Sequence, residues 1–240
     1  MKKNAIQQAR TLRTHIAPER DVTLNYLLYL PPGYDPQQPE RWPLVLFLHG
    51  ASMRGHDINL VKRQGLSKLV NQGQEFPFIL VSPQCPSGQW WTWPQLSAAL
   101  SQLLDEVEST YAVDPERIYV TGLSMGGFGT WSLAIASPQR FAAIVPICGP
   151  AENLDQISAL RYLPVWAFHG DQDVIVPLQD MVKTVNALKA YGGNVELTIY
   201  PGIGHNAADP AYAEPELYRW LLSQRRQSEA GNLLAGDAKA

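Results

Sequence analysis

A serine with a glycine two positions before it and another two positions after it constrains the fold of this chain more than any other feature. Residues 122–126 read Gly-Leu-Ser-Met-Gly, after an apolar run at 117–121 and before a helix-compatible segment at 128–137. On such a turn the backbone passes close to a neighbouring strand, and only small residues leave room at the two flanking positions. The motif predicts a strand–turn–helix unit that exposes Ser124 as a nucleophile.

The chain has the size and composition of one globular domain. Its 240 residues are 45% hydrophobic and 17% charged, which is enough apolar material for one substantial core. Residues 1–226 are predicted to form a single α/β domain. Residues 227–240 show neither periodicity nor turn signals and are predicted to be a flexible C-terminal tail.

The charge of the chain argues against several classes of partner. A formal net charge of −3 gives no broad positive field, so we expect neither nucleic acid nor a membrane surface as a partner. The basic N-terminus is not followed by the apolar core of a signal peptide, and no run has the length of a membrane span. These features predict a cytoplasmic protein, unless an export signal has been removed.

The two cysteines, Cys85 and Cys148, predict neither a disulfide-built fold nor a metal site. They are too few for the first and have no metal-ligand spacing for the second. If the strand order is that of the fold proposed below, they lie at the ends of strands separated by two others, about 14 Å apart at strand spacings of roughly 4.8 Å. A disulfide cannot span that distance, so two buried, reduced thiols are expected.

Strand and helix patterns alternate along most of the chain. This alternation predicts an α/β fold with a mostly parallel central sheet and helices on both faces. Continuous apolar runs, such as 43–48, suit strands that are buried on both sides. The predicted strands are 22–30, 43–48, 78–81, 117–121, 141–147, 164–168 and 195–200, and the predicted helices are 96–111, 128–137, 178–191 and 214–222.

A serine nucleophile needs a histidine base, and the histidine needs a carboxylate that fixes its tautomer. On this type of fold the three follow one another in the order serine, acid, histidine. Asp173 follows the predicted strand 164–168, and His205 follows the predicted strand 195–200. Both lie at carboxyl ends of strands, where ligand chemistry collects in open α/β sheets. The predicted catalytic residues are therefore Ser124, Asp173 and His205.

His15, His56, His169 and Asp171 fit these two roles less well than His205 and Asp173 do. His15 lies in a polar N-terminal arm, and His56 has no matching acid after it in the required order. His169 adjoins a glycine at a strand end, where packing or a loop hydrogen bond is the expected role. Asp171 is expected to shape its loop by accepting backbone N–H groups, because Asp173 is far enough past the strand to curl back towards His205.

The reaction also needs donors aimed at the oxyanion of the tetrahedral intermediate. One predicted donor is the backbone N–H of Met125, the residue after the nucleophile. The other is expected after the predicted strand 43–48, and Ala51 is the chosen position. The side chain of Ser52 is an equally good candidate for a helper or for a loop hydrogen bond.

The chain resembles the α/β-hydrolase superfamily, and within it the carboxylesterase and phospholipase/carboxylesterase branch with related polyhydroxybutyrate-depolymerase-like esterases. The resemblance implies a serine esterase, with Ser124, Asp173 and His205 at the triad positions and Ala51 and Met125 at the oxyanion positions. Relatives often carry a Gly- and Glu-containing stretch after His-Gly. The segments that carry the resemblance are 29–34, 48–50, 81–86, 113–127, 169–173 and 204–205, whereas 51–57 departs from it and reads Ala-Ser-Met-Arg-Gly-His-Asp.

The length of one connection bears on the substrate. Only the sixteen residues 148–163 separate two predicted strands where relatives insert a cap, so no cap domain is expected and the site should be open. Trp90, Trp91 and Trp93 are predicted to form a substrate-binding wall. The alternative, that they pack the long loop onto the domain, is given equal weight.

The predicted function is hydrolysis of short- to medium-chain carboxylic esters through an acyl-enzyme, with a small-molecule ester as substrate and without a cofactor or metal. A feruloyl or acetyl esterase of plant polysaccharides and a prolyl-oligopeptidase-like peptidase are the alternatives. A non-catalytic binder is disfavoured because all three triad positions are filled. The sequence leaves the oligomeric state open.

Overall fold

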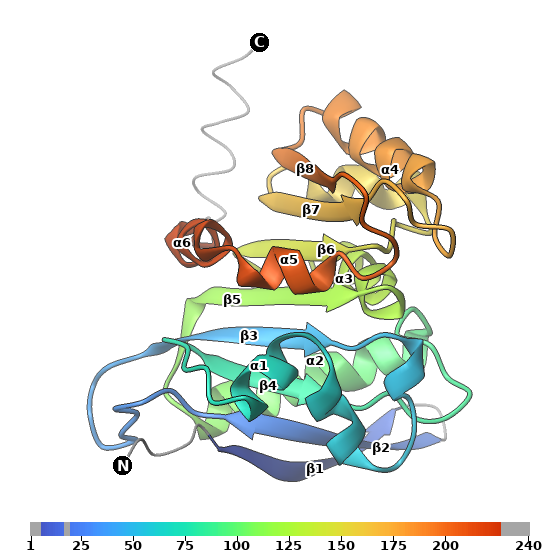
Figure 1. The fold of residues 1–240 in the computed structure, drawn as a ribbon. Helices are drawn as coiled ribbons and strands as arrows, with labels where there is room; N and C mark the ends of the chain where they lie inside the picture. The colour runs from blue at the N-terminus through green and yellow to red at the C-terminus, as the bar shows by residue number, and fades with distance from the viewer. Residues whose placement is uncertain (1–5, 17–19, 227–240) are drawn as a thin grey trace.

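An eight-stranded mixed sheet runs through the described residues and carries helices on both faces (Figure 1). The computed structural model of the chain describes residues 6–16 and 20–226. The strand order is β1-β2-β4-β3-β5-β6-β7-β8; β2 is antiparallel to β1 and to β4, and every other pair is parallel. The predicted α/β architecture is confirmed. The strands are β1 (Gln7–Ile16), β2 (Arg20–Tyr29), β3 (Trp42–Leu48), β4 (Ile79–Pro83), β5 (Val113–Leu123), β6 (Ala143–Ile147), β7 (Val165–Gly170) and β8 (Val195–Tyr200).

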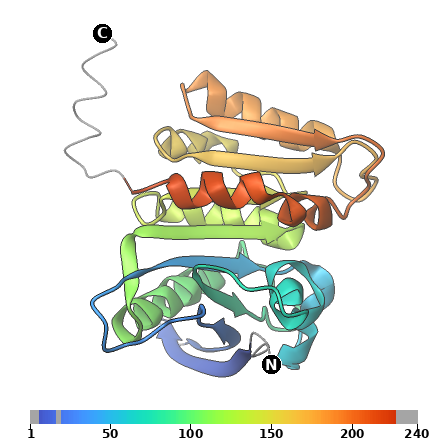
Figure 2. The ribbon, with the colours of Figure 1, turned by 60° about the vertical axis from the view of Figure 1, so that its left-hand side comes forward.

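The helices divide into two groups, one on each face of the sheet. Helices α2, α3 and α4 share one buried apolar cluster with the 3-10 helix η3, and α1, α5 and α6 share another. The turned view shows α5 and α6 lying along the sheet beside its central strands (Figure 2). The helices are α1 (Gly65–Asn71), α2 (Pro94–Thr110), α3 (Met125–Ala136), α4 (Leu178–Ala190), α5 (Ala208–Ala213) and α6 (Pro215–Ser223), and the 3-10 helices are η1 (Ala51–Met53), η2 (Ile58–Arg63) and η3 (Leu154–Leu160).

The central strands place the site. Every residue of β4 and β6 is buried, as expected for parallel strands covered on both faces. Strand β5 lies between β3 and β6, so the turn after β5 lies near the middle of the sheet. The loops after β3, β4, β5, β6, β7 and β8 therefore gather at one edge, where the carboxyl ends of the parallel strands meet (Figure 1).

One strand and two α-helices were not predicted. Strand β1 was expected to be a polar arm, but it pairs with β2 along its whole length. It is an edge strand whose side chains are mostly exposed, so its sequence carries little apolar periodicity. The helices α1 and α5, of 7 and 6 residues, are too short for a clear 3.6-residue pattern.

The connection between β6 and β7 is short. In this stretch, all of which the structure describes, the chain forms η3 and no inserted domain. Cys85 and Cys148 are free, buried thiols beyond β4 and β6, with β3 and β5 between those strands. Among the described helices, none combines the length and apolarity needed to cross a bilayer. The predicted tail 227–240 lies outside the described residues.

Candidate active site

Ser124 occupies a strained turn between β5 and α3. Its backbone dihedrals are φ 56° and ψ −119°, and its N–H donates to the carbonyl of Ile147 at 2.8 Å. A Cβ at Gly122 would lie 2.6 Å from the carbonyl oxygen of Leu48, and one at Gly126 would overlap the same oxygen. The two glycines are therefore required by the approach of β3, and the strain holds Ser124 at the exposed end of the turn.

His205 joins Ser124 to Asp173. The loop after β8 brings His205 Nε2 to 2.7 Å from Ser124 Oγ, and its Nδ1 lies 2.8 Å from Asp173 Oδ2. Because a carboxylate accepts at Nδ1, the proton of the neutral ring is on Nδ1, and Nε2 is free to accept from the serine hydroxyl. The structure thus brings together the three residues chosen from the sequence.

The carboxylate of Asp173 is buried and firmly held. Its Oδ1 accepts the backbone N–H groups of Ile175 and Val176, both at 2.9 Å. Burial alone would raise the pKa of Asp173, but the hydrogen bonds from Val176, His205 and Ile175 hold it below its usual value. Asp173 is therefore ionised at neutral pH and oriented towards His205.

The two nearby alternatives have other contacts. Asp171 is exposed and accepts the N–H of Gly202 at 2.7 Å, which ties its loop to the turn after β8. His169 is fully buried; its Nε2 lies 2.9 Å from the carbonyl of Val176 and 3.3 Å from Asp173 Oδ2. Neither residue contacts Ser124 in a hydrogen bond.

Buried polar contacts orient the loop that carries Ala51. His49 Nδ1 lies 2.7 Å from the carbonyl of Gly50, and its Nε2 accepts the N–H of Cys85 at 2.9 Å. Burial lowers the pKa of His49 to about 4, so the ring is neutral at pH 7 and donates from Nδ1. In a trans peptide the C=O and N–H point in opposite directions. Because the Gly50 carbonyl faces His49, the Ala51 N–H points away from that buried ring.

The N–H groups of Ala51 and Met125 are both unoccupied. Neither donates to an acceptor within the described residues. Met125 begins α3, and the first N–H groups of a helix have no partner inside the helix. The two groups are therefore available to a negatively charged oxygen. Ser52, the other candidate in this loop, has an exposed side chain.

The three tryptophans do not share one environment. Trp91 is 1% exposed, and its Nε1 donates to the carbonyl of His49 at 3.0 Å. Its packing fixes the long loop, so the expectation that it contacts substrate is corrected. Trp90 and Trp93 are 37% and 39% exposed and remain available as a wall.

One buried group could be considered for a metal ion. Cys148, His169 and Asp173 each place a possible ligand atom within 4.8 Å of the others. Burial raises the pKa of the Cys148 thiol to about 12, which opposes the thiolate form that a metal requires. Asp173 Oδ2 is already engaged by His205. The donor set is therefore poorly suited to a cation.

The sequence did not predict the roles of several residues that support the site. Gln64 Oε1 accepts the N–H of Gly50 at 2.6 Å, and Gln84 Nε2 donates to the carbonyls of Met53 and Asp57, both at 2.9 Å. Glutamines that tie loops together have no sequence pattern. The His-Gly pair at 49–50 was visible, but the role of its histidine depends on Cys85, which is distant in the sequence.

A mostly parallel sheet with a hydrogen-bonded serine, histidine and aspartate at its carboxyl edge defines the α/β-hydrolase class. Residues 92–211, half of the chain, match the sequence profile of the phospholipase/carboxylesterase family, and the chain belongs to that family.

Known proteins are similar to different extents of the chain. Poly(3-hydroxyalkanoate) depolymerase C of Paucimonas lemoignei is 32% identical over an alignment 124 residues long, which covers 46% of this chain and 28% of that protein. Acyl-protein thioesterase 1 of Gibberella zeae is 25% identical over 76% of this chain and 92% of its own length. The chain thus spans less than a third of the depolymerase. A solved thermostable esterase matches with a TM-score of 0.79 and 31% identity over 92% of this chain and 63% of its own.

Proposed function

We propose that the protein is a serine carboxylesterase that hydrolyses short- to medium-chain carboxylic esters through an acyl-enzyme. The observation that carries the proposal is the continuous pair of hydrogen bonds from Ser124 Oγ to His205 Nε2 and from His205 Nδ1 to Asp173, at 2.7 and 2.8 Å. This connection gives a weak nucleophile a base, and gives the base a fixed tautomer. Membership of a carboxylesterase family supports the same chemistry.

In the proposed reaction, His205 accepts the hydroxyl proton while Ser124 Oγ attacks the ester carbonyl. The N–H groups of Ala51 and Met125 stabilise the oxyanion, and each such donor is worth about 3 kcal/mol of barrier. The protonated ring then passes its proton to the leaving alcohol, and the acyl group stays on Ser124. Water repeats the sequence and releases the carboxylic acid and the free serine.

The proposed substrate class follows from the rim of the site. The β6–β7 connection has no inserted domain in its described residues, which favours an open site for short acyl groups or for esters displayed on a larger molecule. Trp90 and Trp93 are proposed as an aromatic wall. Feruloyl or acetyl esters on a polysaccharide are the alternative substrates for the same wall.

The first test compares the parent with Ser124→Ala on p-nitrophenyl acetate, butyrate, octanoate and palmitate. We expect a rate loss of about 10³-fold or more in the variant and a maximum at the short chains in the parent. Ser132→Ala is the matched control, because Ser132 is a half-buried serine on α3, the helix that Ser124 precedes. Unchanged activity in Ser124→Ala would overturn the nucleophile, and a maximum at palmitate would overturn the short-chain assignment.

Two further substrates separate the alternatives. A p-nitroanilide of a short peptide tests for a peptidase, and methyl ferulate tests for a feruloyl esterase. We expect the amide to be cleaved far more slowly than the acetate ester. Labelling by a fluorophosphonate, absent in Ser124→Ala, would separate an enzyme from a non-catalytic binder.

A further inference from the structure

Arg54 links two loops at the carboxyl edge of the sheet. It follows η1 directly and is half-buried. Its Nε donates to the carbonyl of Ala51 at 3.1 Å, and its Nη1 donates to the carbonyl of Gln89 at 3.2 Å. One guanidinium therefore joins the loop after β3 to the loop that precedes α2.

The flat face of the same guanidinium lies over an aromatic ring. Its central carbon lies 5.3 Å from the centroid of the Trp90 ring, a cation–π distance. Within the described residues Arg54 forms no ion pair with a carboxylate; its side-chain contacts are the two carbonyls and the ring. Trp90 remains 37% exposed. The arginine thus fixes the ring without burying it.

We propose that Arg54 is a positioning residue. It holds the oxyanion loop, which is the loop after β3 that carries Ala51, in a fixed position relative to the ring of Trp90. The inference rests on the proposed function, because it assigns roles to Ala51 and Trp90 in ester hydrolysis. When the acyl oxygen is bound by the Ala51 N–H, the tie sets where the rest of the substrate meets the Trp90 ring.

Among the other anchors of the oxyanion loop, Trp91 also reaches it from the loop before α2, since its Nε1 donates to the carbonyl of His49 at 3.0 Å, but that contact is buried and does not involve Ala51. Gln84 fixes Met53 and Asp57, and Gly55 N–H donates to Cys85 at 3.0 Å. These contacts lead to residues 84–85, near the end of β4. Of these anchors, Arg54 is the one that extends to the exposed part of the tryptophan loop. Losing Arg54 should therefore leave the loop folded and still tied to Trp91 at His49, but should let Ala51 move relative to the Trp90 ring.

The geometry requires an arginine. Two N–H groups in one rigid plane reach two carbonyls while the plane stacks on an aromatic ring, whereas a lysine ammonium is a single point charge on a flexible stem. Lysine at this position would keep the positive charge and lose the two N–H donors that the guanidinium holds in one plane. The Arg54→Lys variant therefore separates charge from positioning.

The test measures kcat and KM on p-nitrophenyl acetate and octanoate for Arg54→Met, Arg54→Lys, Trp90→Ala and the double variant Arg54→Met/Trp90→Ala. Active sites are counted by fluorophosphonate titration, so that kcat refers to competent enzyme alone. Arg63→Met is the control, because Arg63 is an exposed arginine of η2 without a side-chain hydrogen bond in the described residues.

We expect Arg54→Met to lower kcat on both esters about tenfold and to raise KM on octanoate about fivefold. Arg54→Lys should be impaired nearly as much as Arg54→Met. Trp90→Ala should raise KM on octanoate more than KM on acetate, and should lower kcat on both esters less than Arg54→Met does. The double variant should show no higher KM on octanoate than Trp90→Ala alone, because both changes remove the same contact.

Two results would overturn the proposal: full activity of Arg54→Lys, or a loss in Arg54→Met that disappears once rates are divided by titrated sites. If Arg54→Met does not fold, Arg54→Lys and Arg54→Gln provide the same comparison. Failure of the proposed function is recognised separately, because parent enzyme would then show no Ser124-dependent labelling.

Discussion

Asp171 and Asp173 are two residues apart, yet their carboxylates have different partners. Asp173 accepts from His205 and from two backbone N–H groups, whereas Asp171 accepts from the backbone of Gly202. An asparagine at 173 would keep the shape but present an amide that can favour the wrong tautomer of His205.

We expect Asp173→Asn to lower kcat by about 10³- to 10⁴-fold and Asp171→Asn by less than about tenfold. Both are measured on p-nitrophenyl acetate after active-site titration. Equal losses in the two variants would contradict the assignment of Asp173 as the acid.

His49 gives the protein a sensitivity to mild acid. Its pKa is lowered to about 4 by burial, whereas a histidine in the unfolded chain titrates near 6.5. Between these values the unfolded state binds a proton that the folded state does not. Acidification from pH 7 to pH 4 should therefore reduce the free energy of unfolding by about 3 kcal/mol through this residue.

The measurement is urea denaturation at pH 7, 5.5 and 4 for the parent and for His49→Gln, which retains a donor and an acceptor. The parent should lose stability more steeply than the variant over this range. If the free energy of unfolding falls equally with pH in the parent and in His49→Gln, then His49 is already protonated in the folded state or is not buried.

Single residues differ in how far they could be predicted. Ser124, Asp173 and His205 are marked by a local motif, a chain order and positions after strands. The roles of His49 and Arg54 depend on contacts with Cys85 and Gln89, more than thirty residues away. No local pattern contains such a contact, so these residues could be interpreted only from the structure.

At the scale of elements, the crossing of β3 and α3 is the tightest in the site. We expect Gly126→Ala to destabilise the protein by about 3 kcal/mol or more, because its Cβ would overlap the carbonyl of Leu48 in β3. Gly192→Ala is the control; φ there is +74° with nothing within 4 Å, so only backbone strain of about 1 kcal/mol is expected. Thermal unfolding of both variants measures the loss of stability. Equal losses in the two variants would contradict the close approach of Gly126 to the carbonyl of Leu48.

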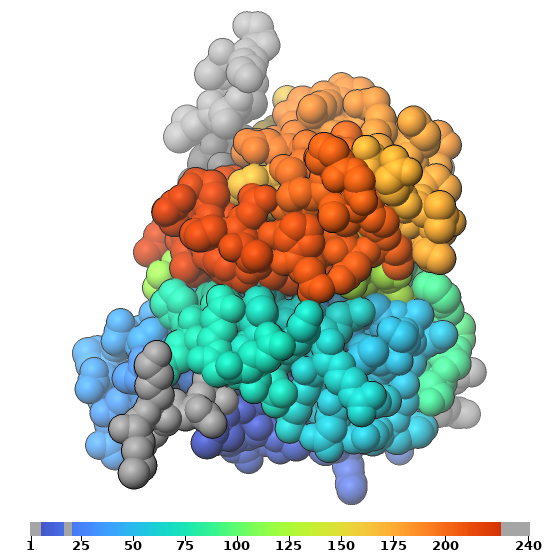
Figure 3. All heavy atoms as spheres, in the orientation of Figure 1, coloured from blue at the N-terminus to red at the C-terminus, as the bar shows by residue number. Residues whose placement is uncertain are grey.

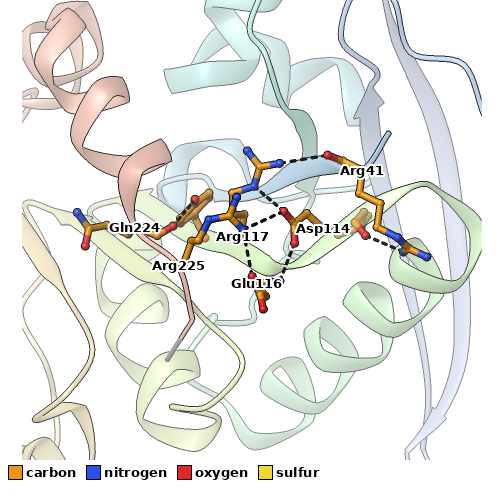
Figure 4. A network of polar contacts seen from close by, with 8 residues as sticks. Arg41, Asp114, Glu116, Arg117, Gln224 and Arg225 are labelled. Carbon is orange, nitrogen blue, oxygen red and sulfur yellow. Dashed lines mark hydrogen bonds and ion pairs between the residues drawn. The ribbon is translucent and has the colours of Figure 1, made fainter. Parts of the chain in front are cut away.

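A polar network joins the end of α6 to the beginning of β5 (Figure 4). Ser124 follows the opposite end of that strand. Asp114 accepts from Arg117 Nε at 2.6 Å, and Arg225 lies 3.1 Å from Glu116 and 3.5 Å from Asp114. The hydroxyl of Tyr119 donates to the carbonyl of Gln224 at 2.8 Å. These contacts fasten the last helix of the described chain to the central strand.

The two acids of this network should contribute unequally. Burial would raise the pKa of Asp114, but hydrogen bonds from Arg117 and from the Glu116 N–H hold it below its usual value. Its side chain is 15% exposed, against 58% for Glu116. We expect Asp114→Asn to cost about 1–2 kcal/mol and Glu116→Gln less than about 0.5 kcal/mol, by urea denaturation at pH 7.

The difference between these variants should vanish in acid. A lowered carboxyl pKa stabilises the fold above the unfolded value of about 3.9, and the contribution is lost as the pH falls through the folded pKa. A difference between the variants that does not shrink at all as the pH is lowered from 7 through the acid range would contradict an ionic role for Asp114.

The elements that could not be predicted share a physical cause. Strand β1 gains its order mainly from its ten pairings with β2, because Leu12 is its one buried side chain. Helices α1 and α5 gain theirs from contact with each other and from the cluster under them. The long α2 and the buried runs of β3 and β4 carry their pattern within themselves, and these were predicted.

At the scale of the whole molecule, the C-terminal segment completes a face that begins much earlier in the chain. The space-filling view shows the segment near residues 200–223 beside the segment near 51–75 (Figure 3). Lys68 of α1 lies 3.1 Å from Asp209 of α5. The mostly parallel arrangement of the sheet was predicted from the alternation of patterns, but this meeting of distant segments was not.

The hydrogen bond between Ser124 and His205 joins residues 81 positions apart, on either side of β6 and β7. It can form only after β5, β6, β7 and β8 have taken their places, and such non-local pairing of parallel strands is slow. Enzymatic activity should therefore be among the last properties to return on refolding. In a stopped-flow experiment, helical circular dichroism should recover before hydrolysis of p-nitrophenyl acetate does. The recovery of hydrolysis would then report when the last step of folding is complete.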